Sequence, residues 1–230
     1  AVVVFDGVAG VEPQSETNWH YADEYNVPRI CFINKLDRMG ASFEKSFASI
    51  RERLTTCAFR VQLPIGAEGD FSGVVDLLRM KAFEFQGDKG ERVVETPIPE
   101  NMKADAEKYR RELIEAIADN DDALMEKYLA GEEIPLEDLM RVLRKAVIAN
   151  KIIPVFTGSA LKNKGVQLVL DAVVDYLPSP LDLPPVKGTN PDTGEELFRK
   201  ADDNEPFTAL AFKIANDPYV GSLTYFRNYA

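Results

Sequence analysis

The sequence predicts an α/β fold built on a parallel sheet, with an α+β insertion inside it and the first strands of an all-β domain after it. The parallel sheet is indicated by continuous apolar runs, typical of strands buried on both faces, that alternate with helical segments. These runs occupy residues 1–5, 29–33 and 152–156. A change to short strands and turns from residue 61 indicates the insertion, and strand patterns beyond a proline-rich connector indicate the all-β domain.

The first 33 residues are expected to form a strand, a helix and a second strand. Pro13 suits the first turn of a helix that runs to about Tyr25, and Asn26 suits a left-handed helix end. Pro28 follows where the helix cannot continue. Two buried strands joined by a helix make one right-handed crossover unit of a parallel sheet.

The next segment begins with a one-faced helix and then departs from the parallel-sheet pattern. The helix is predicted by apolar residues at helical spacing, Phe43, Phe47, Ile50 and Leu54. The strands expected after it lie at residues 61–63, 74–77, 82–85 and 92–94, the last two joined as a hairpin through residues 87–90. Polar helices are expected at about residues 100–119, 122–130 and 135–149, before the buried run at 152–156 and a helix at 165–176. We therefore expect residues 56–151 to be an α+β insertion.

A stiff connector that marks a domain boundary is predicted by clustered prolines, Pro178, Pro180, Pro184 and Pro185. Beyond it, residues 210–214 and 223–226 are interpreted as strands joined by a turn. The chain begins inside one strand pattern and stops inside another. From these ends we expect an internal fragment of a longer protein, with a truncated β domain.

Composition argues against several classes of protein. Of 230 residues, 45 % are hydrophobic and 28 % are charged, as in globular cytosolic proteins. The apolar runs are far shorter than the roughly 20 residues that cross a bilayer, so we expect no membrane partner. The 27 basic and 38 acidic residues give a net charge of −11, so a broad phosphate-binding surface is not expected. Cys31, Cys57 and His20 have no metal-ligand spacing, so neither a disulfide framework nor a zinc site is expected.

The strongest functional signal is Asn34-Lys35-Leu36-Asp37, at the carboxyl end of a buried strand, where open α/β sheets bind ligands. Guanine presents N1–H and a 2-amino group side by side, and the two carboxylate oxygens of Asp37 match both donors. Adenine would leave the carboxylate facing a lone pair, so such a site rejects it by about 10⁴-fold or more. Asn34 is able to bond the O6/N7 edge and to tie neighbouring loops together. The aliphatic stem of Lys35 would cover one face of the base.

A second base-binding loop is expected at Thr157-Gly158-Ser159-Ala160-Leu161-Lys162, which follows the next parallel strand. The main-chain N–H of Ala160 is a candidate donor to guanine O6. Ser159 is expected to brace the loop, with Asp37 as a candidate partner, and Leu161 or Lys162 to cover the remaining face of the ring. Two such loops at strand ends, in this order, favour a guanine site over a chance match.

Other residues carry weaker signals. Asp6-Gly7 is interpreted as a strand-to-loop turn, His20 as an ordinary helix side chain, and Asp70-Phe71-Ser72-Gly73 as a chance match to a γ-phosphate sensor. We interpret one group of acidic residues as a solvated surface; its members are Asp119, Asp121, Asp122, Glu132 and Glu133. The sequence contains no Gly-x-x-x-x-Gly-Lys-[Ser/Thr] loop, which would hold the β- and γ-phosphates and Mg²⁺.

Longer stretches of sequence, beyond the base-binding motifs, carry a resemblance to a known family. They are Val4-Phe5-Asp6-Gly7-Val8-Ala9-Gly10-Val11-Glu12-Pro13-Gln14-Ser15-Glu16-Thr17, the stretch from residue 28 to residue 41, Gln62-Leu63-Pro64-Ile65-Gly66-Ala67-Glu68, residues 158–167 and Ala211-Phe212-Lys213-Ile214. Over essentially the whole chain, these phrases resemble the elongation factor G family of bacterial-type translational GTPases. The resemblance implies a cytoplasmic protein that binds GTP and GDP, hydrolyses GTP with Mg²⁺, and drives tRNA and mRNA through the ribosome.

The resemblance also implies a division of the chain. Residues 1–55 and 152–180 would form the second half of a P-loop GTPase domain, residues 56–151 a subdomain facing the ribosomal stalk protein, and residues 181–230 a linker and the start of a β-barrel domain. The residues that match the family's guanine-binding positions are Asn34, Lys35, Asp37, Ser159, Ala160 and Leu161. The family's phosphate loop, switches and switch histidine have no counterpart, so we expect this chain alone to be inactive in hydrolysis. The alternative is an interaction module whose insertion docks a ribosomal protein while the base loops bind nothing.

Overall fold

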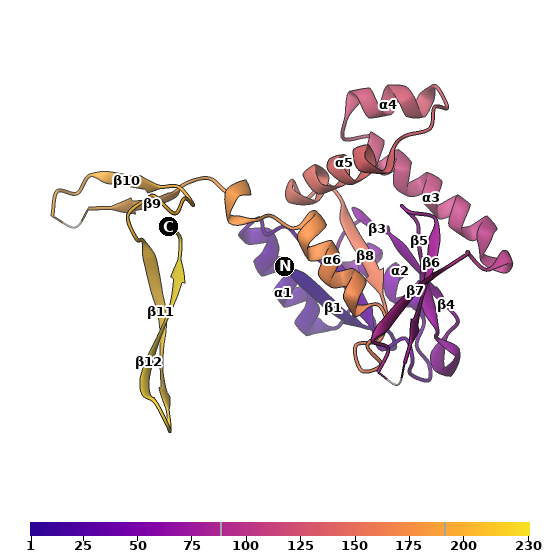
Figure 1. Cartoon of the computed structure of the whole chain (residues 1–230), viewed down its shortest axis with the longest axis horizontal. Helices are drawn as coiled ribbons and strands as arrows, with labels where there is room; N and C mark the ends of the chain where they lie inside the picture. The colour runs from indigo at the N-terminus through magenta and orange to yellow at the C-terminus, as the bar shows by residue number, and fades with distance from the viewer. Residues whose placement is uncertain (88, 191) are drawn as a thin grey trace. The chain divides into compact units, whose positions relative to one another are not determined.

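A computed structural model of the chain describes residues 1–87, 89–190 and 192–230 and divides into two units, residues 1–177 and residues 178–230 (Figure 1). The first unit is built on a four-stranded parallel sheet with the strand order β1-β2-β8-β3. Its strands are β1 (Val2–Asp6), β2 (Ile30–Asn34), β8 (Ile153–Thr157) and β3 (Ala58–Arg60). The predicted α/β class with a parallel sheet is therefore confirmed.

The two central strands of this sheet, β2 and β8, lead directly into the two predicted base loops and so fix where each loop begins. Cys31 lies opposite Val155, and Ile33 lies opposite Thr157. Every residue of β8 is buried, and β2 is buried up to Asn34, as continuous apolar runs predict. Since the strands run in parallel and in register, the residues that follow each of them emerge at the same edge of the sheet.

Three helices accompany the parallel sheet: the first connects β1 to β2, the second connects β2 to β3, and the third follows β8. They are α1 (Pro13–Glu24), α2 (Phe43–Arg53) and α6 (Val166–Tyr176). Beyond α1, Asn26 has the predicted left-handed conformation, with φ of 49°. In α2, Phe43, Phe47 and Ile50 form the buried part of the predicted stripe. Leu54, its fourth member, caps the end of the helix and is partly buried against the core. The Ser42 hydroxyl caps the start of the helix by accepting from the N–H of Lys45.

The fourth strand of the parallel sheet, β3, differs from the sequence expectation. Ala58 lies opposite Ile153 and Arg60 opposite Val155, in parallel pairing. Residues 58–60 therefore pair within the parallel sheet, although they fall inside the range 56–151 that was expected to form the insertion. A three-residue strand is too short to show periodicity, and the long-range pairing with β8 defines it.

The segment after β3 forms the predicted α+β arrangement. An antiparallel sheet has the order β4-β5-β6-β7, comprising β4 (Gln62–Ile65), β5 (Gly73–Asp76), β6 (Lys81–Gln86) and β7 (Arg92–Thr96). Three helices follow, α3 (Lys103–Ala118), α4 (Asp122–Leu129) and α5 (Leu136–Ile148), with 3₁₀ turns at Glu68–Asp70 and Glu100–Met102. The β6–β7 hairpin is confirmed, although residue 88 of its turn lies outside the described residues. Buried side chains from both sheets and their helices form one continuous apolar core.

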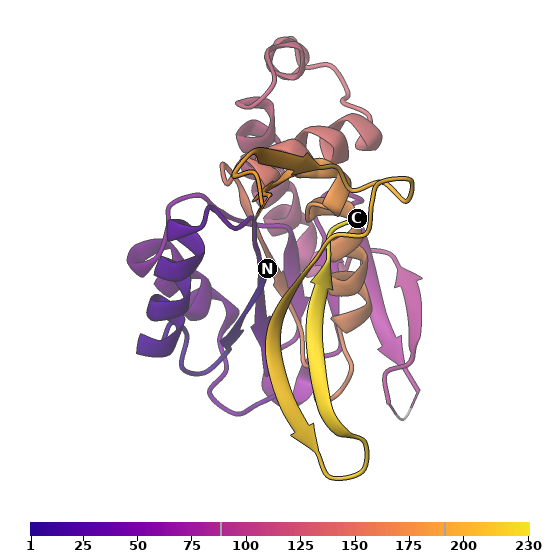
Figure 2. The ribbon, with the colours of Figure 1, turned by 90° about the vertical axis from the view of Figure 1, so that its left-hand side faces the viewer.

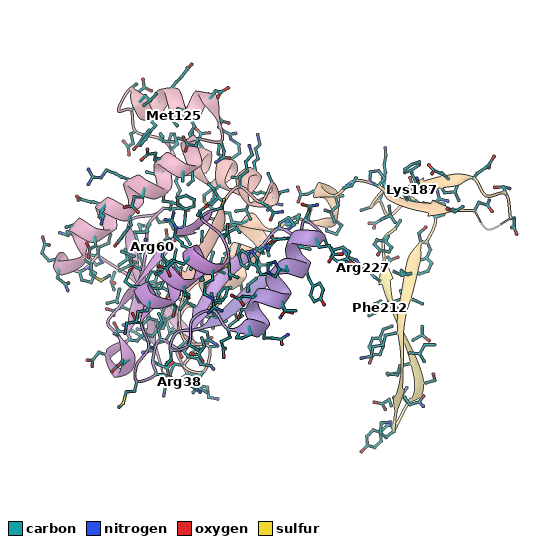
Figure 3. The ribbon with its side chains drawn as sticks, turned by 180° about the vertical axis from the view of Figure 1, so that it is seen from behind. Arg38, Arg60, Met125, Lys187, Phe212 and Arg227 are labelled. Atoms are coloured by element: carbon teal, nitrogen blue, oxygen red, sulfur yellow. The ribbon has the colours of Figure 1, made fainter. Side chains whose placement is uncertain are left out.

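Arg60, labelled in Figure 3, contacts side chains from two helices of the first unit. Its guanidinium carbon lies 3.9 Å from the ring centroid of Phe47 on α2 and 4.3 Å from that of Tyr109 on α3. Its Nη2 atom donates to the Glu44 carboxylate at 2.6 Å. A planar cation between two aromatic faces is a favourable contact, so this residue holds the helix of the insertion against the parallel sheet.

The second unit contains two antiparallel hairpins, of which Figure 2 shows the longer, β11–β12. The strands are β9 (Val186–Thr189), β10 (Glu196–Arg199), β11 (Ala209–Asp217) and β12 (Gly221–Asn228), after a 3₁₀ turn at Pro180–Asp182. The β11–β12 hairpin was predicted, whereas β9 and β10 were not, because short mixed-polarity strands carry little periodic signal. Among the helices in the described residues, none combines the length and apolar character needed to cross a bilayer.

Candidate functional site

The two predicted base loops lie side by side at the carboxyl edge of the parallel sheet. The Gly158 N–H donates to the carbonyl oxygen of Ile33 at 3.0 Å, and the Leu36 N–H donates to the carbonyl oxygen of Gly158 at 3.2 Å. These two hydrogen bonds extend the β2–β8 pairing into the loops. Residues 34–37 and 157–162 thus lie next to each other at one edge of the sheet, as expected for segments that follow neighbouring parallel strands.

Asn34 links the two loops through its side chain. Its Oδ1 atom accepts from the main-chain N–H of Lys35 at 2.8 Å and from that of Ala160 at 2.8 Å. The Ala160 N–H, which the sequence suggested for guanine O6, is therefore engaged by Asn34 in this structure. Within the described residues, the Nδ2 group of Asn34 makes no hydrogen bond, so it is a free donor at the site.

Asp37 is half-buried, and over the described part of the chain its carboxylate makes no hydrogen bond or ion pair. Leu36 beside it is only 3 % exposed and anchors the loop in the core. Lys35 has φ of 65°, a left-handed conformation that turns the chain sharply between Asn34 and Asp37. This turn leaves both Asp37 oxygens available to accept hydrogen bonds.

Lys35 forms an ion pair that sequence reasoning missed. Its Nζ atom lies 2.6 Å from Oδ2 of Asp6, which ends the neighbouring strand β1. The other Asp6 oxygen accepts from the N–H groups of Val8 and Ala9, at 2.8 and 3.4 Å, as in the expected turn. The hydrogen bond from Lys35, followed by those from the main chain, lowers the pKa of the Asp6 carboxyl. The ion pair could have been predicted, because Asp6 ends a strand predicted to lie parallel to the strand that ends at Asn34.

Ser159 braces the second loop from within. It is fully buried, and its main chain exchanges two 2.9 Å hydrogen bonds with Lys164. Its hydroxyl oxygen accepts from the Lys162 N–H at 3.3 Å, so Ser159 stabilises its own loop and, within the described residues, makes no bond to Asp37. Ala160 is exposed and Leu161 is 83 % exposed, which leaves the Leu161 side chain unpacked at the rim of the site.

The insertion contacts the second base loop, a feature the sequence did not indicate. The Lys164 Nζ atom donates to the carbonyl oxygen of Phe71 at 2.6 Å, and Gln167 Nε2 donates to that of Gly90 at 3.2 Å. A Cβ atom on Gly90 would lie 2.6 Å from the carbonyl oxygen of Lys162. Gly90 in the β6–β7 connection therefore packs closely against the base loop.

The weaker sequence candidates lie elsewhere. His20 is exposed on α1, and Asp70 is exposed in a 3₁₀ turn of the insertion. Asp121 caps α4 by accepting from the Leu124 N–H at 3.1 Å and lies 3.8 Å from Arg141, so it has a structural role. The other acidic residues of that group are exposed; they are Asp119, Asp122, Glu132 and Glu133. The described residues hold no group of three or more His, Cys, Asp or Glu side chains placed to bind a metal ion.

Comparison with known proteins identifies relatives of the whole chain. Residues 1–179 match the family described as the elongation factor Tu GTP binding domain. Over 230 residues the chain is 54 % identical to elongation factor G of Thermotoga maritima and 53 % identical to that of Thermotoga petrophila, which covers 100 % of this chain and 33 % of each relative. A crystal structure of a protein from Thermus thermophilus superposes on 100 % of this chain and 31 % of its own with a TM-score of 0.81 at 28 % identity. The chain thus spans about a third of the length of these relatives.

Proposed function

Because the chain belongs to the elongation factor Tu GTP-binding domain family, we propose that it supplies the guanine-recognition part of a GTP-hydrolysing translation factor. One observation carries this proposal. An unpartnered carboxylate, Asp37, follows β2, and the loop after β8 is joined to the same segment through Asn34. A purine held at this edge of the sheet would meet groups from both loops.

Each of the six matching residues has a role in the proposed site. The two oxygens of Asp37 accept from N1–H and the 2-amino group of guanine, while the free Nδ2 of Asn34 donates to the O6/N7 edge. Guanine O6 competes with Asn34 Oδ1 for the Ala160 N–H. The stem of Lys35, held by Asp6, and the exposed Leu161 cover the two ring faces. Ser159 keeps the second loop in shape.

We further propose how the chain divides. Residues 1–60 and 152–180 belong to the GTPase domain, because β1, β2, β3 and β8 share one sheet. Residues 61–151 form the inserted subdomain. Residues 181–230 form a linker and the first strands of a β-barrel domain, a position consistent with exposed apolar side chains such as Phe212 (Figure 3).

The whole protein would use GTP hydrolysis to move tRNA and mRNA through the ribosome in the cytoplasm. Phosphate-loop and Mg²⁺-binding residues are not among those of this sequence, so positioning and charge stabilisation of the transferred phosphoryl group must come from elsewhere in that protein. This chain alone is therefore expected to release no phosphate from GTP, with or without ribosomes. Measurable phosphate release by the purified chain would contradict the proposal.

Base specificity provides the direct test. In a protein that joins this chain to a phosphate-binding loop, Asp37→Asn should shift preference from GDP toward xanthosine diphosphate, because the amide donates to the 2-oxo group. Competition binding with the two nucleotides measures the shift. Asp70→Asn, at the exposed 3₁₀ turn, is the matched control and should leave GDP preferred. Unchanged GDP selectivity in Asp37→Asn would remove Asp37 from the base site.

A second candidate function, docking of the ribosomal stalk protein, is favoured by exposed acidic residues on the insertion. Asp122 and Glu132 are exposed and, within the described residues, make no ion pair. Acidic surfaces attract basic partners in a salt-dependent way. Charge reversal at these two positions should weaken stalk-protein binding at low salt, whereas reversal at Asp203 in the second unit should not. Asp121 is unsuitable for this test because it caps α4. Equal binding by both variants would exclude this surface.

A further inference from the structure

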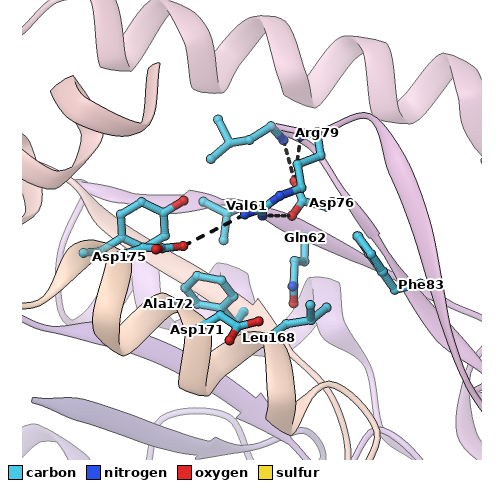
Figure 4. A pocket seen from close by; sticks show the side chains of 12 residues that line it. Val61, Gln62, Asp76, Arg79, Phe83, Leu168, Asp171, Ala172 and Asp175 are labelled. Atoms are coloured by element: carbon cyan, nitrogen blue, oxygen red, sulfur yellow. Dashed lines mark hydrogen bonds and ion pairs between the residues drawn. The ribbon is translucent and has the colours of Figure 1, made fainter. Parts of the chain in front are cut away.

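A cavity of about 160 Å³ lies between α6 and the antiparallel sheet of the insertion (Figure 4). None of the six candidate base-binding residues lines it. Its apolar walls come from Phe83, Phe156, Leu168 and Ala172. The volume is below the roughly 300 Å³ at which pockets accommodate drug-sized ligands, so a smaller molecule fits this space.

The charges around the cavity do not balance. Asp76 is 6 % exposed and already engaged, because its Oδ2 lies 2.9 Å from Arg79 and its Oδ1 accepts from the N–H groups of Leu78 and Arg79. A second carboxylate, Asp175, lies at 4.0 Å from the same guanidinium (Figure 4). Asp171 also lines the cavity and, in the described part of the chain, has no partner. The side chains that line the cavity thus include three carboxylates and one guanidinium, an excess of negative charge.

The cavity also contains an unused polar group. Tyr176 is only 3 % exposed, yet within the described residues its hydroxyl makes no hydrogen bond. Because the hydroxyl has no partner of its own, it is available to donate to a ligand or to accept from one. Burial, reinforced by the negative charge of Asp76, raises the pKa of Tyr176, which keeps the hydroxyl neutral and able to accept a hydrogen bond.

We propose that this cavity binds a small organic cation, an amine or amidine carried on a compact apolar body. The cationic nitrogen atoms would donate to the Asp171 carboxylate and the Tyr176 hydroxyl, with Asp175 adding negative charge. The apolar body would pack against Phe83 and Leu168. An anion is disfavoured, because Asp76 already neutralises the one guanidinium at the site. Since no base-loop residue lines the cavity, this proposal and the guanine site can fail separately.

Benzamidine and benzamide form a matched pair of probes, of nearly the same shape but different charge. In a titration of the isotope-labelled chain followed by two-dimensional NMR, benzamidine should shift the amide signals of Gln62 and of α6 residues 171–176. Benzamide should shift them much less. Equal shifts from the two probes, shifts confined to other residues, or no shifts would each overturn the proposal.

Variants then test the named groups. Asp171→Asn, at an exposed helix position, should weaken benzamidine binding by about threefold or more. Tyr176→Phe should also weaken it, and its amide spectrum checks that the fold is intact. Asp122→Asn removes one negative charge on α4, outside the cavity lining, and should leave the affinity unchanged. Unchanged affinity in Asp171→Asn, or an equal loss in Asp122→Asn, would show that Asp171 does not recognise the cation.

Discussion

The side-chain oxygen of Asn34 accepts a hydrogen bond from the Ala160 main-chain N–H at 2.8 Å, although 126 positions separate the two residues. The same oxygen accepts from the Lys35 N–H at 2.8 Å, so one amide fixes both loops. The side chain that we propose to contact the base therefore also sets the spacing of the two loops that would surround it.

Replacing Asn34 by alanine tests this link. Asn34→Ala leaves two main-chain N–H groups without their acceptor, and we expect a loss of about 1–3 kcal/mol in the free energy of unfolding. Urea denaturation measures the loss, and hydrogen exchange at the Ala160 amide should become faster. Asn34→Asp retains an oxygen acceptor and should keep most of the protection at Ala160. Wild-type stability and protection in Asn34→Ala would contradict the structural role.

The Lys35–Asp6 ion pair predicts acid sensitivity. Because the pKa of Asp6 is lowered in the folded chain, its carboxylate contributes stability above the pKa of the unfolded chain, about 4. That contribution is lost as pH falls through the lower pKa of the folded state. The stability difference between wild type and Asp6→Asn should therefore shrink when urea denaturation is moved from pH 7 to pH 3. For the exposed Asp122→Asn control, the difference should stay small at both values, and a difference for Asp6→Asn that does not depend on pH would refute the ion-pair effect.

The position of Arg60 between two rings predicts that lysine is a poor replacement. Arg60→Lys keeps the charge but loses the planar stacking on Phe47 and Tyr109, which we expect to cost about 1–2 kcal/mol of unfolding free energy. Arg227 provides the control, since its guanidinium lies over one ring, that of Tyr229, at 5.4 Å. Arg227→Lys should change stability by less than about 0.5 kcal/mol. Equal effects of the two substitutions on thermal or urea unfolding would show that stacking of Arg60 between the two rings does not stabilise the fold.

The close approach of Gly90 to the second base loop predicts a steric effect. Gly90 and Gly131 both have positive φ, 60° and 71°, so alanine is strained at either position. A Cβ atom at Gly90 would lie 2.6 Å from the Lys162 carbonyl oxygen, whereas one at Gly131 would meet nothing within 4 Å. Gly90→Ala should therefore destabilise the chain more than Gly131→Ala and increase hydrogen exchange at Lys164. Similar unfolding midpoints for the two variants would show that close packing of Gly90 against the second base loop does not limit the stability of the chain.

Most of the fold was predictable because its signals are local. The buried strands β2 and β8 appear as continuous apolar runs, and α2 appears as a stripe of phenylalanine and isoleucine at helical spacing. The resemblance to elongation factor G, seen in short phrases around these elements, is confirmed over the full chain. The three-residue strand β3 was missed because its pairing with β8 depends on residues nearly a hundred positions away.

The sequence by itself determined which residues follow which strands, and so placed Asp37 and Ser159 at one edge of a parallel sheet. The sequence also indicated that Asn34 could tie the neighbouring loops together. Only the tertiary structure decided that its partner is the Ala160 N–H, that Lys35 pairs with Asp6, and that Gly90 of the hairpin turn packs against the second loop. Periodicity and strand ends are properties of neighbouring residues, and a single chain shows them. Hydrogen bonds and ion pairs between distant segments exist only once packing has brought their partners together.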